Sequence, residues 1–524
     1  MKPYLPKRFA PFFGQRQQTL CLGTRGPLGV IQERIPIETL NSHVYVCGQT
    51  GKGKSSYLLH LAQQLIVSNQ GVGLLDPHGD LVSDLIATLA AYPKRRPWLA
   101  DPHNRHRVIY LDPRSEHRLP FNPLASTDHA PYVVAQHVIE AFRRTWREEL
   151  TAAPRFTNIA LHSLLALIAN KLSLIDLARF LTHRRYREQL LHRVADRAVV
   201  DFFRERFDRW GREAPLMIES LLNKSTALTL NPYLSPMLGA AACLSLRTIM
   251  DQGKILLVNL RTPDEETRTL LGSLLMTAFE QAALARENLA PDKRKKFYLF
   301  VDEFQKFVAS EGSAITLAEI LSECRKYGLQ LTVAHQSWAQ LGAKSQLAGA
   351  LEQCQVKVIF GTGRQTAEAI VKDLFLPDPQ SIKHEVKDSE AQERTHPVFD
   401  PLLEQFEMCT QTIQRLRRRQ VLVKLPDQDH VLTLRTPTVP TPRISRERLA
   451  AIKTELARQS AHAAAAVTPT TNARRAPVAQ PAPPPAAHPT GAPATTAETA
   501  WKDALWRTHP RPAPRARVIF SHPA

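Results

Sequence analysis

The chain has 524 residues, and Lys and Arg outnumber Asp and Glu by 68 to 49, which gives a formal net charge of +19. This excess predicts a polyanionic partner or an anionic membrane surface. Hydrophobic residues make up 43% of the chain, so a wholly disordered protein is excluded. The six cysteines form no CxxC pair, which argues against a disulfide framework or a zinc site and favours a reducing cytosol.

The apolar segments are too short or too interrupted to cross a membrane. The longest, residues 160–181, contains His162, Asn170, Lys171 and Asp176, whereas a spanning helix needs roughly 18 to 20 apolar residues. The first 14 residues have no apolar region of the kind found in secretory signals. We therefore expect a cytoplasmic protein that contacts the inner face of the cell membrane at most peripherally.

In chain order, a lead segment (1–42) precedes short apolar runs that alternate with helix-period segments. This alternation predicts an α/β fold with a mostly parallel sheet. The expected strands are 43–47, 71–76, 107–112, 255–260, 297–302, 329–334 and 356–361. They fall into a first part of a nucleotide-binding domain, residues 43–127, and a second part, residues 246–436.

Two segments depart from this alternation. Between residues 128 and 245 the strand signal stops and helix-period segments take over, which predicts an all-α insertion domain. Residues 437–524 hold 15 of the 39 prolines and 12 Lys and Arg against 4 Asp and Glu, which predicts a disordered basic tail. Within it, 444–459 and 499–508 have helical spacing, either as nascent helices or as partner-docking motifs that fold on binding.

The first expected strand leads into a glycine-rich loop, 48-GQTGKGKSS-56, which satisfies G-x-x-x-x-G-K-[ST]. In such loops backbone N–H groups surround phosphates, the lysine reaches the β and γ phosphates, and the hydroxyl binds Mg²⁺. The pattern predicts ATP with Mg²⁺. The expected nucleotide-binding residues are Gly48, Gln49, Thr50, Gly51, Lys52, Gly53, Lys54, Ser55 and Ser56. For Lys52, a solvated charge is favoured over a second phosphate contact.

A second half-site is expected where the apolar run of 297-FYLFVDEF-304 ends in two acids. We expect Asp302 to be a magnesium ligand together with Ser55. We expect Glu303 to be the general base that polarises the attacking water. The alternative is a buried strand that ends in two surface acids. Two adjacent acids with separable roles favour hydrolysis over nucleotide binding alone.

Further candidates follow other expected strands. Gln336 after strand 329–334 is positioned to sense the γ-phosphate, although a glutamine there is often a simple surface residue. Arg325 could stabilise transition-state charge in a neighbouring subunit, or could be a solvated cation at a helix end. Arg364 is a weaker candidate of the same kind. In 75-LDPHGDL-81, Asp76 and, less strongly, His78 are site candidates at the carboxyl edge of the sheet.

With these motifs in order, the chain resembles the type IV secretion system coupling proteins, the conjugative DNA-transfer ATPases of the HerA/FtsK superfamily. The resemblance covers roughly residues 43–436. It rests on GQTGKGKSS, LDPHGDL, VIYLDPRSEHRLPFNPL, GKILLVNLRT, FVDEFQKFV and CRKYGLQLTVAHQSWAQL. It implies a RecA-like P-loop core interrupted by an all-α domain, a homo-hexamer, and ATP-driven movement of DNA or relaxase-bound DNA into a secretion channel. Many members carry N-terminal transmembrane helices, whereas here only a short lead precedes Gly48.

Two other functions stay open. One is a HerA-like motor in chromosome maintenance or repair, and the other is an adaptor that recruits substrate while ATP only stabilises the assembly. DNA contact is expected to be sequence-independent phosphate electrostatics. The basic clusters 143–146, 183–188 and 415–420 are candidates for it, or are ordinary solvated faces.

Overall fold

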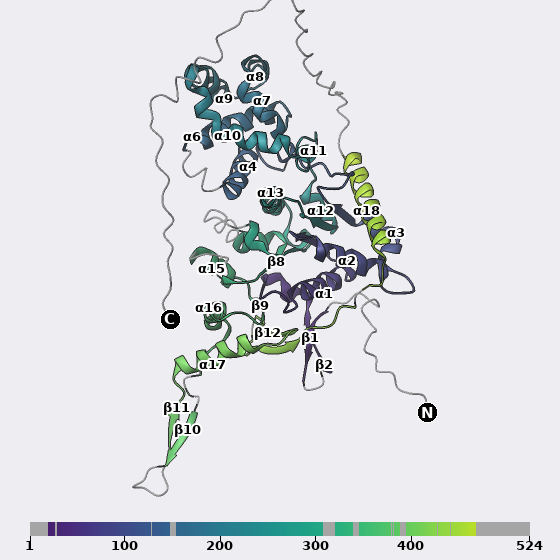
Figure 1. The fold of residues 1–524 in the computed structure, drawn as a ribbon, viewed down its shortest axis with the longest axis vertical. Helices are drawn as coiled ribbons and strands as arrows, with labels where there is room; N and C mark the ends of the chain where they lie inside the picture. The colour runs from purple at the N-terminus through teal and green to yellow at the C-terminus, as the bar shows by residue number, and fades with distance from the viewer. Residues whose placement is uncertain are drawn as a thin grey trace, which may run out of the picture. The chain divides into compact units, whose positions relative to one another are not determined.

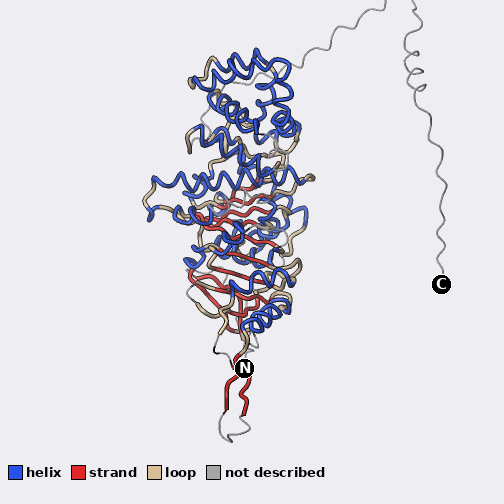
Figure 2. Tube along the Cα trace, turned by 90° about the vertical axis from the view of Figure 1, so that its left-hand side faces the viewer, coloured by secondary structure: helices blue, strands red, loops and turns tan. Residues whose placement is uncertain are grey.

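The seven apolar runs predicted as strands all form strands, and they lie side by side in one 11-stranded sheet (Figures 1 and 2). The computed structural model describes residues 19–467 except 27–28, 127, 147–153, 308–319, 339–344, 379, 381, 388–394, 427 and 441. The seven strands pair in parallel in the order β9-β3-β8-β7-β4-β6-β5. Their bounds are β3 Val44–Cys47, β4 Gly71–Asp76, β5 Val108–Leu111, β6 Ile255–Asn259, β7 Phe297–Val301, β8 Leu329–His335 and β9 Val356–Phe360. All their residues are buried, as expected for parallel strands that are covered on both faces.

Four antiparallel strands extend the sheet beyond β9, in the order β2-β1-β13-β12. They are β1 Thr19–Arg25, β2 Ile31–Pro36, β12 Gln420–Lys424 and β13 Leu432–Arg435. The backbone N–H of Cys21 donates to Gln64 Oε1 at 2.8 Å, and the Cys21 carbonyl pairs with His60 Nε2 at 2.8 Å. Residues 19–36 of the lead segment therefore belong to the sheet, because β1 joins it and is hydrogen-bonded to the first helix.

Helices cover the sheet on both faces. Helices α1 Lys54–Val67 and α2 Asp80–Ala91 pack on one face, in one hydrophobic cluster. Helices α13 Glu265–Leu284 and α16 Arg364–Leu374 contribute to the cluster on the other face. Helix α12 Leu246–Gln252 leads into β6. This three-layer arrangement leaves the carboxyl ends of the parallel strands as the edge where loops meet.

The predicted all-α insertion is present. Figure 1 shows α6 to α10 gathered together, away from the strands. The helices of this region are α4 Pro131–Thr145, α6 Pro154–Ala169, α7 Leu177–Thr182, α8 Arg184–Leu191, α9 Arg197–Asp201, α10 Ala214–Leu230 and α11 Ser235–Leu238. The described residues of 128–245 form no strand. An isolated antiparallel β-bridge joins Phe121, before the region, to Cys243 near its end.

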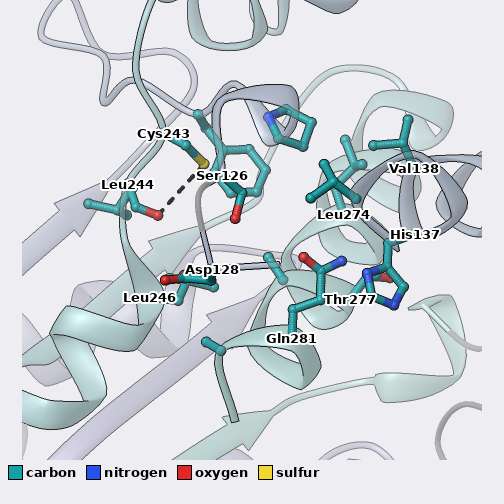
Figure 3. A pocket seen from close by; sticks show the side chains of 15 residues that line it. Ser126, Asp128, His137, Val138, Cys243, Leu244, Leu246, Leu274, Thr277 and Gln281 are labelled. Carbon is teal, nitrogen blue, oxygen red and sulfur yellow. Dashed lines mark hydrogen bonds between the residues drawn. The ribbon is translucent and has the colours of Figure 1, made fainter. Parts of the chain in front are cut away.

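A small cavity of about 40 Å³ marks the place where the insertion joins the sheet domain (Figure 3). Residues from α4, α13 and the segment 243–246 line it, including Val138, Cys243 and Leu274. None of the residues predicted for the nucleotide site is among its lining residues. The cavity therefore belongs to the packing between the two regions and not to the candidate site.

The C-terminal part adds helix α17 Leu402–Arg415, a separate hairpin of β10 Ile382–Lys387 and β11 Thr395–Phe399, and helix α18 Arg446–Val467. Leu456 and Ala457 of α18 are buried, and Ser460 Oγ accepts the backbone N–H of Tyr110 in β5 at 3.0 Å. The prediction of disorder from residue 437 is thus wrong for α18, because its apolar side finds a partner in the edge strand of its own sheet. Residues 468–524, with the motif at 499–508, lie outside the described residues.

Candidate active site

The parallel register brings four of the predicted groups to one edge of the sheet. Cys47 at the end of β3 pairs with His335 of β8, and Val301 of β7 pairs with both Val333 of β8 and Leu75 of β4. The loops that follow these strands therefore emerge side by side. They carry the P-loop, Gln336, the pair Asp302 and Glu303, and the turn with Asp76 and His78.

The P-loop has the backbone that a phosphate cradle needs. Gly51 and Gly53 have φ values of 79° and 113°, which side-chain-bearing residues rarely adopt. A Cβ at Gly48 would lie 2.4 Å from Cβ of Phe360, so the loop passes directly over β9. Gly53 leads into the N-terminus of α1, where free N–H groups favour an anion.

Lys54 is the charged group inside this loop. It is buried, and its Nζ donates to the carbonyl of Gly48. Burial lowers the pKa of Lys54, and the negative charge of Asp302 partly opposes that shift. The ammonium is thus held between the loop and the acidic strand, where it could turn to a phosphate. Ser55 and Ser56 are exposed in the same first turn of α1.

Lys52 takes a role that neither interpretation of the sequence anticipated. Its Nζ donates to the Leu416 carbonyl at 2.8 Å, and its own carbonyl accepts the backbone N–H of Arg419 at 2.9 Å. Lys52 therefore fixes the P-loop to the turn between α17 and β12. That turn belongs to the basic cluster 415–420, so one of the three clusters considered for DNA contact lies beside the P-loop.

Asp302 is a buried carboxylate next to two other acids. Burial, followed by the negative charges of Asp76 and Glu303, raises the pKa of Asp302 to about 6. A cation would relieve this repulsion. Among the described residues, no group of three or more His, Cys, Asp or Glu forms a metal site. Mg²⁺ that shares ligands with phosphates needs only one or two protein ligands, and the oxygen donors of Ser55 and Asp302 fit that requirement.

Glu303 is surrounded by hydrogen-bond donors. Its Oε1 accepts from Gln336 Nε2 at 2.6 Å, and its Oε2 is 2.6 Å from Lys306 Nζ and 2.9 Å from His78 Nε2. Burial works against the charged form, but the hydrogen bonds from Lys306 and His78 lower the pKa of Glu303. The side chain is therefore an ionised carboxylate at neutral pH, as a general base must be.

Gln336 connects this carboxylate to the P-loop. While its Nε2 donates to Glu303, its Oε1 accepts from Thr50 Oγ1 at 2.9 Å. A single amide thus bridges the loop that could hold phosphates and the acid that could activate water. This is the location expected of a residue that senses the γ-phosphate.

The two candidates of the LDPHGDL turn make different contacts. Asp76 Oδ1 accepts the N–H of His78 at 2.9 Å and Asp76 Oδ2 accepts the N–H of Val82 at 3.0 Å, so both oxygens shape the turn. His78, the weaker candidate, faces Glu303 instead. Lys306 was not identified from the sequence. Its spacing of three from Glu303 across the turn η9 Phe304–Phe307 was the available signal, because residues i and i+3 align in a 3₁₀ turn.

The two arginine candidates lie at different ends of the strands: Arg364 begins α16, just after the loop whose Gly361 carbonyl accepts the backbone N–H of Gln49 at 3.0 Å. Arg325 is in η10 Cys324–Tyr327, at the amino end of β8, while Gln336 follows the carboxyl end. The seven residues of β8 put about 20 Å between these two ends, so Arg325 does not reach the P-loop of its own chain. Arg364 pairs with Glu368 at 2.7 Å and with Glu407 at 2.9 Å.

The family model for the type IV secretion-system coupling protein DNA-binding domain matches residues 29–436. The chain belongs to the type IV secretion-system coupling proteins. This confirms the resemblance inferred from the motifs. No curated protein matches the chain.

Solved coupling proteins share the fold. The unbound bacterial conjugative coupling protein TrwBdeltaN70 is 19% identical with a TM-score of 0.53, over 81% of this chain and 90% of that one. TrwB in complex with the non-hydrolysable GTP analogue GDPNP is 18% identical with a TM-score of 0.51, over 78% and 89%. TrwB in complex with ADP and Mg²⁺ is 18% identical with a TM-score of 0.50, over 82% and 91%. The predicted fold class of this coupling protein, a P-loop core with a mostly parallel sheet and an all-α insertion, is confirmed. Within its described part, no helix has the length and apolar character needed to cross a membrane.

Proposed function

We propose that this coupling protein is an ATP-hydrolysing DNA translocase that delivers DNA, or a relaxase bound to DNA, to a type IV secretion or conjugation machine. The observation that carries the proposal is the bridge from Thr50 through Gln336 to Glu303, because a site that only bound nucleotide would not need its acid connected to the P-loop. Family membership supports the DNA substrate, and the nucleotide complexes of TrwB support the P-loop as the ATP site.

The proposed chemistry assigns one role to each residue. Lys54 and the P-loop backbone bind the phosphates, and Ser55 and Asp302 would hold Mg²⁺, which would neutralise phosphate charge there. Glu303 accepts a proton from the attacking water as the new bond to the γ-phosphorus forms. The bond from the γ-phosphorus to the bridging oxygen breaks, and ADP takes the electron pair. Gln336 reports the state of the γ-phosphate to Glu303.

The position of Arg325 suggests how copies of the chain would cooperate. Because Arg325 lies at the amino ends of the strands, it can serve only the nucleotide of another copy, as an arginine finger does. We therefore include a homo-hexamer in the proposal. The net charge of +19 supports sequence-independent contact with DNA phosphates, and a relaxase and the secretion machinery at the inner face of the membrane would be the protein partners.

Replacing Glu303 by Gln tests the proposal. Because the amide keeps the size of the side chain but cannot accept the proton, we expect ATP affinity within about twofold of wild type and turnover lowered about 100-fold or more. Glu352→Gln, at an exposed glutamate of α15 Ser345–Glu352, is the matched control and should leave both quantities unchanged. Wild-type turnover in the Glu303 variant would contradict the assignment.

A further inference from the structure

The two carboxylate oxygens of Glu303 have different surroundings. Oε2 lies 2.6 Å from the Lys306 ammonium nitrogen Nζ and 2.9 Å from the His78 imidazole nitrogen Nε2. These two nitrogens are 3.2 Å apart. Oε1 contacts only the amide of Gln336 among the hydrogen bonds of the described residues. One oxygen is thus anchored on the side of β4, and the other faces the P-loop through Gln336.

The anchoring groups are themselves held by local backbone structure. The turn that carries His78 is fixed by the two N–H groups that donate to Asp76. Lys306 lies in the 3₁₀ turn η9, and its backbone N–H donates to the Glu303 carbonyl at 2.9 Å. Both positions are thus fixed by hydrogen bonds within the chain itself.

Glu303 needs such anchors for two reasons. Its φ of 46° lies in the left-handed region, which is unfavourable for a residue with a side chain, so its backbone does not settle there without support. Its neighbour Asp302 is a buried acid whose charge repels the Glu303 carboxylate. Without donors on the far side, the carboxylate would turn away from Asp302 and from the P-loop.

We propose that His78 and Lys306 are positioning residues that fix Oε2 of Glu303, so that Oε1 is the oxygen that accepts the proton from the attacking water. The inference rests on the proposed ATPase function and extends it to two residues that touch neither the P-loop nor Gln336 in any hydrogen bond of the described residues. Their effect should therefore appear in the catalytic step and not in nucleotide binding.

The test uses the full chain and two pairs of variants, with ATP turnover and the affinity for a fluorescent ATP analogue as measurements. His78→Ala and Lys306→Met remove a donor, whereas His78→Gln and Lys306→Arg retain one at a similar reach. We expect the first pair to lower kcat about tenfold to 100-fold with KM and affinity within about twofold, and the second pair to recover most of the loss. His103→Ala, at an exposed histidine of α3 Pro102–His106, is the control and should behave as wild type.

A combination with Glu303→Gln separates positioning from a general structural effect. If His78 and Lys306 act through Glu303, His78→Ala or Lys306→Met should cause no further loss in the Glu303→Gln background. Three results would overturn the inference. The first is an equal loss of kcat in the wild-type and Glu303→Gln backgrounds, and the second is a donor-retaining variant that does not recover kcat. The third is wild-type kcat in both donor-removing variants. In each of those cases turnover that still depends on Glu303 would leave the proposed function standing. Turnover that survives Glu303→Gln alone would instead reject the function.

Discussion

At the scale of single residues, one side-chain amide makes two hydrogen bonds that join two parts of the candidate site. Gln336 accepts a hydrogen bond from Thr50 with its oxygen and donates one to Glu303 with its nitrogen. A carboxylate at this position could not donate, and an apolar side chain could do neither. Among the hydrogen bonds of the described residues, this amide is what joins Thr50 of the P-loop to Glu303.

Two glycines near the site edge share nearly the same backbone φ and make a matched pair for a stability prediction. Gly79 and Gly51 have φ values of 80° and 79°, but a Cβ at Gly79 would lie 2.2 Å from Asn259 Oδ1, whereas a Cβ at Gly51 meets nothing within 4 Å. Gly51→Ala should lower the free energy of unfolding by about 1 kcal/mol through backbone strain alone. Gly79→Ala should lose a further ~1 to 3 kcal/mol through overpacking. Urea unfolding measures both, and equal losses would contradict the role of Asn259.

The sequence predicts those site residues that follow a fixed local pattern. The P-loop and the acids at 302 and 303 could be identified because spacing alone specifies them. The contact of His78 with Glu303 could not, because it joins residues 225 positions apart and exists only since β4 lies beside β7. The contact of Lys52 with Leu416, 364 positions apart, was inaccessible for the same reason.

At the scale of elements, helix α18 protects an edge of the sheet. Strand β5 is the last strand on its side, and its outer N–H groups would otherwise be open to pairing with another chain. Ser460 accepts one of them from Tyr110, and Lys453 Nζ donates to Ser83 Oγ of α2 at 2.5 Å. The helix thus covers β5 and contacts the helix that follows the LDPHGDL turn.

Truncation tests this role of α18. A chain that ends at residue 445 should lose about 3 kcal/mol of folding free energy, because the burial of Leu456 is lost, and should self-associate through the uncovered β5. A chain that ends at residue 469 keeps α18 and is the control. Thermal unfolding and size-exclusion chromatography check both variants. Equal stability of the two truncated chains would contradict the account.

The strands that the sequence predicts are the buried parallel ones, and the strands it does not reveal are short or alternating. The run 297–301 is apolar throughout because both faces of β7 are covered. Strand β2 has one buried residue, Ile35, and β13 buries only every second residue, so neither forms an apolar run. The proline and alanine content around helix α18 predicts disorder, whereas the apolar spacing of residues 444–459 predicts a helix.

At the scale of the whole molecule, buried histidines link stability to pH. Burial lowers the pKa of His43, His60 and His335 to about 4, compared with 6.5 for an exposed imidazole. Between these values the unfolded chain binds more protons than the folded one. The contribution of each histidine is therefore fully present above pH 6.5 and is lost as the pH falls towards 4.

His60→Gln isolates one of these contributions. The amide retains a donor for the Cys21 carbonyl but does not titrate, so the loss of folding free energy between pH 7 and pH 5 should shrink by about 2 kcal/mol relative to wild type. Urea unfolding of both proteins at the two pH values measures the difference. An unchanged pH dependence would show that His60 is not held neutral in the folded protein.

The whole molecule is proposed to couple two polyanions, ATP at the edge of the sheet and DNA as cargo. The most direct measurement is the rate of ATP turnover by the full chain with and without DNA, at several salt concentrations. The account predicts Mg²⁺-dependent turnover that DNA increases severalfold, and an increase that weakens steeply as salt rises, because phosphate contacts release counterions. Turnover that is absent, or that is the same with and without DNA, would contradict it.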